Sequence, residues 1–177
     1  DAERWLRWVH PKTDRCRSSS STDRTFLATI DWITLFEWER CEVDAKTEQT
    51  TILIVEDNVS NFVLMARMLG YMGMHCEWKT SGYEVVEYAD TLPNIDLILM
   101  DIRLPYEDGY EALEKLRSAA RLKDIKIVAV TAYASEEQLQ RARGAGFDGF
   151  IGKPLDPDRF PTQIRRVLAG EEVWEVE

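Results

Sequence analysis

Five polar side chains stand at the ends of short apolar runs, and their types suit one kind of chemistry. Glu56 and Asp57 follow "TILIV", and Asp101 follows "LILM". Thr131 ends "KIVAVT", and Lys153 follows "GFIG". Short apolar runs rich in β-branched residues are typical of strands buried on both faces. Each of these polar residues is therefore expected at the carboxyl end of a buried strand.

Three carboxylates, one hydroxyl and one ammonium at one place predict a phosphoryl-transfer site. Carboxylates a few ångströms apart repel one another and raise at least one pKa, and a divalent cation removes that conflict. Oxygen ligands with retained waters are what Mg²⁺ prefers, and Mn²⁺ suits the same ligands. Thr131 can donate a hydrogen bond to a phosphoryl oxygen, and Lys153 adds a positive charge. A carboxylate is then the nucleophile.

The elements that must position these residues alternate along the chain. The expected strands are 51–56, 74–79, 96–101, 126–132 and 149–153, with 74–79 as an edge strand. Ser81, Asp108 and Ser135 are expected helix caps, and the last helix is expected to begin near Asp156 and to end by Gly170. Five strands alternating with five helices predict an α/β domain with a doubly wound parallel sheet. Ligands bind such sheets beyond the carboxyl ends of the strands.

Four motifs, in order and spacing, resemble the receiver domain of two-component response regulators. They are "ILIVEDN" (52–58), "LILMDIRLPYEDG" (97–109), "VAVTA" (128–132) and "GFIGKP" (149–154). The resemblance covers residues 49–170, which form the expected receiver domain. This domain is similar to the single-domain chemotaxis regulators. The resemblance implies a flavodoxin-like sheet of five strands in the order 2-1-3-4-5, with five helices.

The resemblance also assigns roles to the residues of the site. It implies that Asp101 is the phospho-acceptor, which attacks a phosphohistidine of a histidine kinase or histidine phosphotransfer protein. Asp57 and Asp101 are then direct Mg²⁺ ligands, and Glu56 acts through a metal-bound water. The backbone carbonyl of Arg103 completes the ligands. Lys153 pairs with the phosphoryl group or, before transfer, with Asp101.

A switch is implied by the same resemblance. Thr131 moves toward the phosphoryl group and Phe150 turns inward, which favours one state of a partner-binding face at about 133–169. Phe150 has a plainer alternative as a core aromatic. The Lys153–Pro154 peptide bond is expected to be cis.

Three further positions adjust the implied site. Ala132 leaves room for the phosphoryl group, whereas Arg103 and Tyr133 tune dephosphorylation in a direction that the sequence leaves open. A haloacid-dehalogenase-type phosphatase is the least favoured alternative, because its pattern needs an aspartate where Arg103 stands. The other alternative is a phosphorelay shuttle that passes its phosphoryl group to a histidine phosphotransfer domain. Apart from its own phosphorylation and dephosphorylation, the chain is not expected to be an enzyme.

Composition excludes several partners and compartments. A formal net charge of −10 argues against direct binding of nucleic acid, which needs fields of Lys and Arg. No run is long and apolar enough for a membrane span or a signal peptide. Three widely spaced cysteines without a CxxC pair indicate a reduced chain, so a cytoplasmic location is expected.

The two ends of the chain do not follow the strand and helix pattern. Residues 1–48 hold four of the six tryptophans and form an N-terminal extension of uncertain structure. Three alternatives stay open: a segment packed on the receiver or on a second copy as a homodimer, a docking segment for another protein, or a non-native stretch. Residues 171–177 are expected to be an acidic tail, with no DNA-binding output domain after it.

Overall fold

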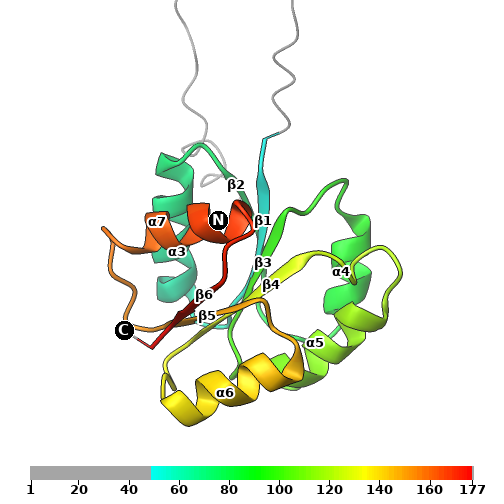
Figure 1. Cartoon of the computed structure of the whole chain (residues 1–177). Coiled ribbons are helices and arrows are strands. Elements are labelled where there is room, and N and C mark those ends of the chain that lie inside the picture. The colour runs from blue at the N-terminus through cyan, green and yellow to red at the C-terminus, as the bar shows by residue number, and fades with distance from the viewer. Residues whose placement is uncertain (1–48, 177) are drawn as a thin grey trace, which may run out of the picture. The chain divides into compact units, whose positions relative to one another are not determined.

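The computed structural model describes residues 49–176, which are built around one parallel sheet (Figure 1). Its strands lie in the order β2-β1-β3-β4-β5-β6, and every neighbouring pair is parallel. The strands are β1 Thr51–Val55, β2 His75–Lys79, β3 Leu97–Met100, β4 Lys126–Thr131, β5 Gly149–Gly152 and β6 Val173–Glu175. The predicted α/β class, the edge position of β2 and the order 2-1-3-4-5 are confirmed.

Helices cover both faces of the sheet, as a doubly wound fold requires. They are α3 Val59–Tyr71, α4 Val85–Thr91, α5 Gly109–Ser118, α6 Glu136–Ala145 and α7 Phe160–Leu168. Helices α3 and α7 lie on one face, and α4, α5 and α6 lie on the other (Figure 1). The five helices in the described part of the chain match the number that the sequence predicts.

Two apolar clusters hold these layers together, one on each face. Alternate residues of β1 divide between them: Ile52 and Ile54 join the cluster with α3 and α7, whereas Leu53 and Val55 join the cluster with α4, α5 and α6. All four side chains are fully buried. Strands that are apolar on both faces in this way provide a rigid base for the polar residues that follow them.

Helix caps follow the predictions at two positions and depart from them at a third. Asp108 caps α5 by accepting from the amides of Tyr110 and Glu111, and Ser135 caps α6. Ser81 does not cap α4, so that prediction was wrong. The helix begins after Glu84, whose φ of 54° ends a tight turn.

The last helix begins later than predicted. Asp156 accepts hydrogen bonds from the backbone amides of Asp158 and Arg159, which closes a turn, and α7 starts only at Phe160. Pro161 lies in the first helical turn as expected, where its missing amide hydrogen has no cost. The Lys153–Pro154 peptide bond is cis, as predicted.

The C-terminal segment corrects the predicted number of strands. Residues 171–177 were expected to form an acidic tail, but Val173–Glu175 form a sixth strand. This β6 strand lies beside β5, with Phe150 opposite Trp174 and Ile151 opposite Glu175. The sheet therefore extends one strand beyond the predicted five.

The predicted extension at 1–48 lies outside the described residues. Within the described range, no helix has both the length and the apolar composition that a membrane span requires.

Candidate functional site

The polar residues predicted from the strand ends meet at one edge of the sheet. Glu56 and Asp57 directly follow β1, and Asp101 directly follows β3. Thr131 is the last residue of β4, and Lys153 directly follows β5. In the strand register, Val55 lies opposite Met100, and Thr131 lies opposite Gly152. Parallel strands in this register bring the five side chains to the same edge.

Lys153 connects two of the carboxylates. Its Nζ lies 2.6 Å from Oδ2 of Asp101 and 2.5 Å from Oε2 of Glu56. The side chains of Lys153, Asp101 and Glu56 are only 9%, 10% and 1% exposed. Because water is largely excluded, these charge-assisted hydrogen bonds hold the acid groups firmly in place.

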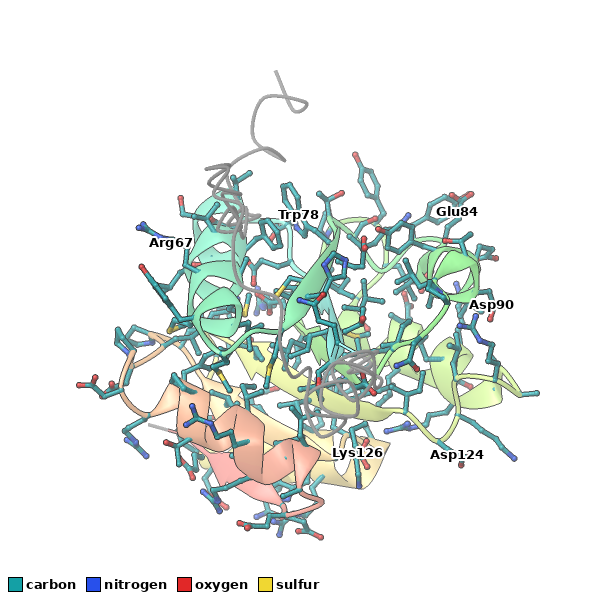
Figure 2. The ribbon with its side chains drawn as sticks, turned by 90° about the horizontal axis from the view of Figure 1, so that it is seen from above. Arg67, Trp78, Glu84, Asp90, Asp124 and Lys126 are labelled. Carbon is teal, nitrogen blue, oxygen red and sulfur yellow. The ribbon has the colours of Figure 1, made fainter. Side chains whose placement is uncertain are left out.

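Glu56 has further partners that the sequence did not indicate. Its Oε1 accepts from Asn61 Nδ2 at 2.9 Å and from the backbone amide of Asn58 at 3.3 Å. Its backbone carbonyl accepts from the indole of Trp78 at 2.8 Å, and that indole stacks on Phe62. Figure 2 shows Trp78 beside helix α3. The only sequence signal for Asn61 is its place in the first turn of the helix that follows the site.

Asp101 is fixed by its backbone and by the loop after it. Its amide donates to the carbonyl of Val55, and its Oδ1 accepts from the amide of Arg103 at 3.0 Å. A Cβ at Gly109 would lie 2.6 Å from the carbonyl oxygen of Asp101, so only glycine lets α5 begin so close to the strand end. Asp101 is thereby held with its carboxylate toward Lys153.

The site opens into a cavity of about 470 Å³. Asp57, Thr131 and Arg141 are among the residues that line it. The guanidinium of Arg103 lies 3.8 Å from the centre of the Tyr133 ring, in a cation–π contact that bridges the two sides. The two predicted tuning positions therefore touch each other.

The remaining predicted residues lie close to this cavity or under it. The hydroxyl of Thr131 accepts from the amide of Tyr133 at 3.4 Å, and Ala132 is exposed. Phe150 is fully buried and joins the cluster under α4, α5 and α6. The ring therefore points inward. An inward ring is expected both for a core aromatic and for an aromatic switch, so both alternatives remain.

The donor set fits a divalent cation. Carboxylate oxygens of Glu56, Asp57 and Asp101 all lie within 4.8 Å of one another. Three carboxylates and the single ammonium of Lys153 leave two negative charges in excess when the groups are ionised. Oxygen donors with an excess charge of two match the preference of Mg²⁺. The exposed position of Asp57 leaves one side open to water.

Comparisons with known proteins agree with this geometry. Residues 52–165 match the response regulator receiver domain, and the chain belongs to this family. The polar-differentiation response regulator DivK of Brucella ovis is 35% identical over 118 residues, which are 67% of this chain and 95% of DivK. Nearly the whole length of DivK therefore corresponds to one part of this chain.

A second kind of relative is much longer. The signal transduction histidine-protein kinase BarA of Escherichia coli K12 is 35% identical over 120 residues, which are 68% of this chain. Those residues are 13% of the length of BarA. The similarity to BarA therefore concerns one part of that kinase.

Solved structures show the same fold. A CheY-like receiver domain of Methanospirillum hungatei has a TM-score of 0.62 and 30% identity, and the match covers 69% of this chain and 95% of that one. The receiver domain of the sensor histidine kinase PA1611 of Pseudomonas aeruginosa has a TM-score of 0.60 and 30% identity. That match covers 69% of this chain and 96% of the PA1611 domain, which was solved with a magnesium ion coordinated in its active-site cleft.

Proposed function

We propose that this receiver accepts a phosphoryl group on Asp101 from the phosphohistidine of a histidine kinase or histidine phosphotransfer protein. The observation that carries the proposal is the buried Lys153 ammonium between Asp101 and Glu56, beside Asp57. The kinase BarA and the response regulator DivK among its relatives support a partner of this class. The function requires a cytoplasmic location, and the charge of −10 disfavours direct nucleic-acid binding.

The chemical step is an in-line displacement at phosphorus. One carboxylate oxygen of Asp101 attacks, a P–O bond forms, and the P–N bond to the donor imidazole breaks. The bonding electron pair leaves with that imidazole nitrogen, which then takes a proton from water. Hydrolysis of the acyl phosphate later restores Asp101 and releases phosphate. The chain acts on itself and turns over no separate substrate.

This chain's residues orient the acceptor and balance its charge. The amide of Arg103 holds Oδ1 of Asp101, and the Lys153 ammonium holds Oδ2. After transfer, Lys153 is free to pair with a phosphoryl oxygen, and the hydroxyl of Thr131 can donate to another. Both interactions grow stronger as negative charge moves onto the phosphoryl group.

Mg²⁺ would be held by Asp57 and Asp101 directly, by Glu56 through water and by the backbone carbonyl of Arg103. When bound, it supplies positive charge to the phosphoryl oxygens. The magnesium ion of the PA1611 receiver supports this assignment. Mn²⁺ suits the same oxygen donors.

The response to phosphorylation is a shift between two states of the face at 133–169. Thr131 and Phe150 lie on the neighbouring strands β4 and β5, and the amide of Lys153 donates to the carbonyl of Thr131 at 2.8 Å. A movement of Thr131 toward the phosphoryl group therefore changes the packing of Phe150 beneath α6. Ala132 leaves the space for the group, and Arg103 with Tyr133 covers it.

Incubation with Mg²⁺ and acetyl phosphate, followed by intact mass spectrometry, tests the acceptor. We expect one added phosphoryl group on the wild-type chain and none on Asp101→Asn. Asp124→Asn is the matched control, because it removes an exposed carboxylate away from the site. An unchanged mass gain in Asp101→Asn would disprove the assignment.

The shuttle function is favoured by the resemblance to one part of BarA, since a kinase of several parts can relay phosphoryl groups internally. Chain labelled on Asp101 would then return its phosphoryl group to a histidine phosphotransfer domain. Transfer to such a domain faster than hydrolysis supports the shuttle, whereas hydrolysis alone supports a terminal receiver.

A further inference from the structure

The β6 strand fits β5 closely because β5 begins and ends with glycine. A Cβ at Gly149 would lie 2.8 Å from the carbonyl oxygen of Val173. A Cβ at Gly152 would lie 2.0 Å from the carbonyl oxygen of Val176 and 2.7 Å from Cβ of Ala134. Larger residues at these positions would push the added strand away. The edge of β5 is thus shaped to receive another backbone.

Alternate side chains of β6 reach the two faces of the sheet. Val173 is fully buried in the cluster with α3 and α7. Trp174 packs against the cluster that contains Phe150, and the guanidinium of Arg143 lies 4.4 Å from the centre of its ring. An aromatic residue at this position is thus held between the core and a cation.

The third residue of β6 meets a set of donors on and before α7. Glu175 accepts from Gln163 at 2.7 Å, from Arg166 at 2.8 Å and from Arg159 at 2.9 Å. With Arg143 of α6, three guanidiniums surround this edge. The chemistry of the edge therefore selects an extended segment with an aromatic residue followed by a carboxylate.

The interaction resembles the addition of a peptide strand to an exposed sheet edge, in which backbone pairing gives affinity and alternate side chains give specificity. Here the added strand has only three residues, and its carboxylate is 25% exposed. Short, partly solvated elements open at low free energy. We therefore expect this strand to open at a lower free energy than the inner strands, even though Val173 leaves the core with it.

We infer that the β5 edge between α6 and α7 is a binding site for an extended aromatic and acidic segment of a partner protein. Residues 173–176 occupy this site as a competing strand of the same chain. The inference rests on the proposed partner face at 133–169 and specifies how a partner binds there. Its test uses no phosphodonor, so its failure leaves phosphoryl acceptance by Asp101 unaffected.

A peptide with the sequence of residues 171–177, "EEVWEVE", is the probe, and the full chain is the receptor. Glu175→Lys reverses the charge that meets Arg159 and Arg166, so this variant releases its own strand. Glu171→Lys makes the same change in charge at a side chain that is 60% exposed and bonded to Arg166 alone. Peptide binding is followed through the amide resonances of residues 149–152.

We expect the peptide to bind Glu175→Lys with a Kd at least about tenfold below that of wild type, because a tethered strand competes at a high effective concentration. Glu171→Lys should behave as wild type. Adding Gly149→Ala to Glu175→Lys should remove peptide binding, since the new Cβ meets the backbone of the docked strand. Hydrogen exchange at 172–176 verifies that the strand has been released; if it stays protected, Trp174→Ala/Glu175→Lys replaces the single variant.

Equal peptide affinity in wild type and in a variant with a released strand would overturn the inference. Retained binding after Gly149→Ala would also overturn it, because the peptide would then lie elsewhere. Native mass spectrometry separates the remaining outcome. Wild-type dimers that are lost in Glu175→Lys, with no peptide bound to that variant, would mean that the edge accepts only the strand of a second copy and would overturn the inference.

Discussion

Two charged clusters flank β5, and they have opposite arrangements. At the carboxyl end, the Lys153 ammonium lies between the carboxylates of Asp101 and Glu56, with side-chain exposures of 10% or less. At the outer edge, the Glu175 carboxylate lies between Arg159 and Arg166, with exposures of 25% to 52%. One cluster is desolvated, and the other remains in contact with water.

The two clusters suit different roles because their charge balance and their exposure to water differ. The buried cluster has an excess of negative charge, so it is incomplete without a further cation or a redistribution of charge at Asp101. The outer cluster is balanced, because Arg166 also pairs with Glu171, and water weakens every pair in it. The first arrangement suits chemistry at a fixed point, and the second suits a strand that attaches reversibly.

Removal of the central cation tests the buried cluster most strongly. Lys153→Met leaves buried carboxylates without their partner, and loss of one member of a buried pair costs about 3–5 kcal/mol in the free energy of unfolding. Urea denaturation without Mg²⁺ measures the loss. Added Mg²⁺ should recover part of it, because the carboxylates remain.

Lys126→Met is the matched control for that variant. Lys126 is 46% exposed and lies 3.5 Å from Asp148, and such surface pairs contribute about 0–1 kcal/mol. Equal losses in the two variants would contradict the contrast between the two clusters.

The excess charge is tested at Asp57, the exposed member of the acid group. Asp57→Asn removes one negative charge while Lys153 stays in place, so Mg²⁺ affinity should fall about tenfold, or about 1.4 kcal/mol. Isothermal titration calorimetry measures the change. Asp124→Asn has the same change in charge and should bind Mg²⁺ as wild type does. An effect of Asp57→Asn no larger than that of this control would disagree with the proposed ligands.

Acid should release the outer strand. A hydrogen bond from Gln163 holds the pKa of Glu175 below its ordinary value of 4.5, and Arg166 and Arg159 lower it further, against the opposite effect of burial. The docked strand therefore favours the carboxylate form. Docking should be complete above the ordinary pKa and should be lost as the pH falls through the lowered pKa. The indole N–H resonance of Trp174 reports the docked fraction.

Glu175→Gln is the control for the acid response and should flatten it. Glu172 accepts a hydrogen bond from the Trp174 indole that serves as the reporter, so Glu172→Gln is a second control that leaves Glu175 unchanged. If the response is the same in Glu175→Gln as in wild type, the charge of Glu175 does not hold the strand.

The smallest expected effect concerns the cation above Trp174. Arg143→Gln removes the cation–π contact, which contributes about 0.5–1 kcal/mol at exposed sites. Hydrogen exchange at 173–176 should become faster by a few-fold. Arg141→Gln loses a similar contact with Tyr110 and should leave exchange at 173–176 unchanged. Faster exchange in both variants would point to a general loss of stability.

The carboxyl-end cluster could be predicted from sequence because strand ends determine positions in space. If "LILM" is a buried strand of a doubly wound sheet, Asp101 must lie at its carboxyl end, where ligands bind. Lys153 must lie at the same edge because it follows "GFIG". Asn61 escaped prediction because an asparagine in a first helical turn is usually an exposed or capping residue. Ser81 failed as a cap because Gly82 packs against the carbonyl of Glu107, which shapes a turn before α4.

The outer cluster could not be predicted for a different reason. "EEVWEVE" has more carboxylates than apolar residues, and three residues are too few for a clear strand pattern. Pairing of β6 depends on Gly149 and Gly152, because a side chain at either position would collide with the backbone of the added strand. It also depends on Arg159 and Arg166, which meet Glu175 only once α7 is placed. Arg143 of α6 likewise meets Trp174 only once α6 is placed.

The hydrogen bond from Trp78 to the backbone of Glu56 places an intrinsic fluorophore beside the acid groups of the site. The indole stacks on Phe62 with ring centres 4.4 Å apart and is bonded to the residue whose carboxylate meets Lys153. Indole emission responds to the local electric field, so a charge that arrives among the acids changes the fluorescence of Trp78. We therefore expect the emission of Trp78, one of six tryptophans, to report occupancy of the site without an added label.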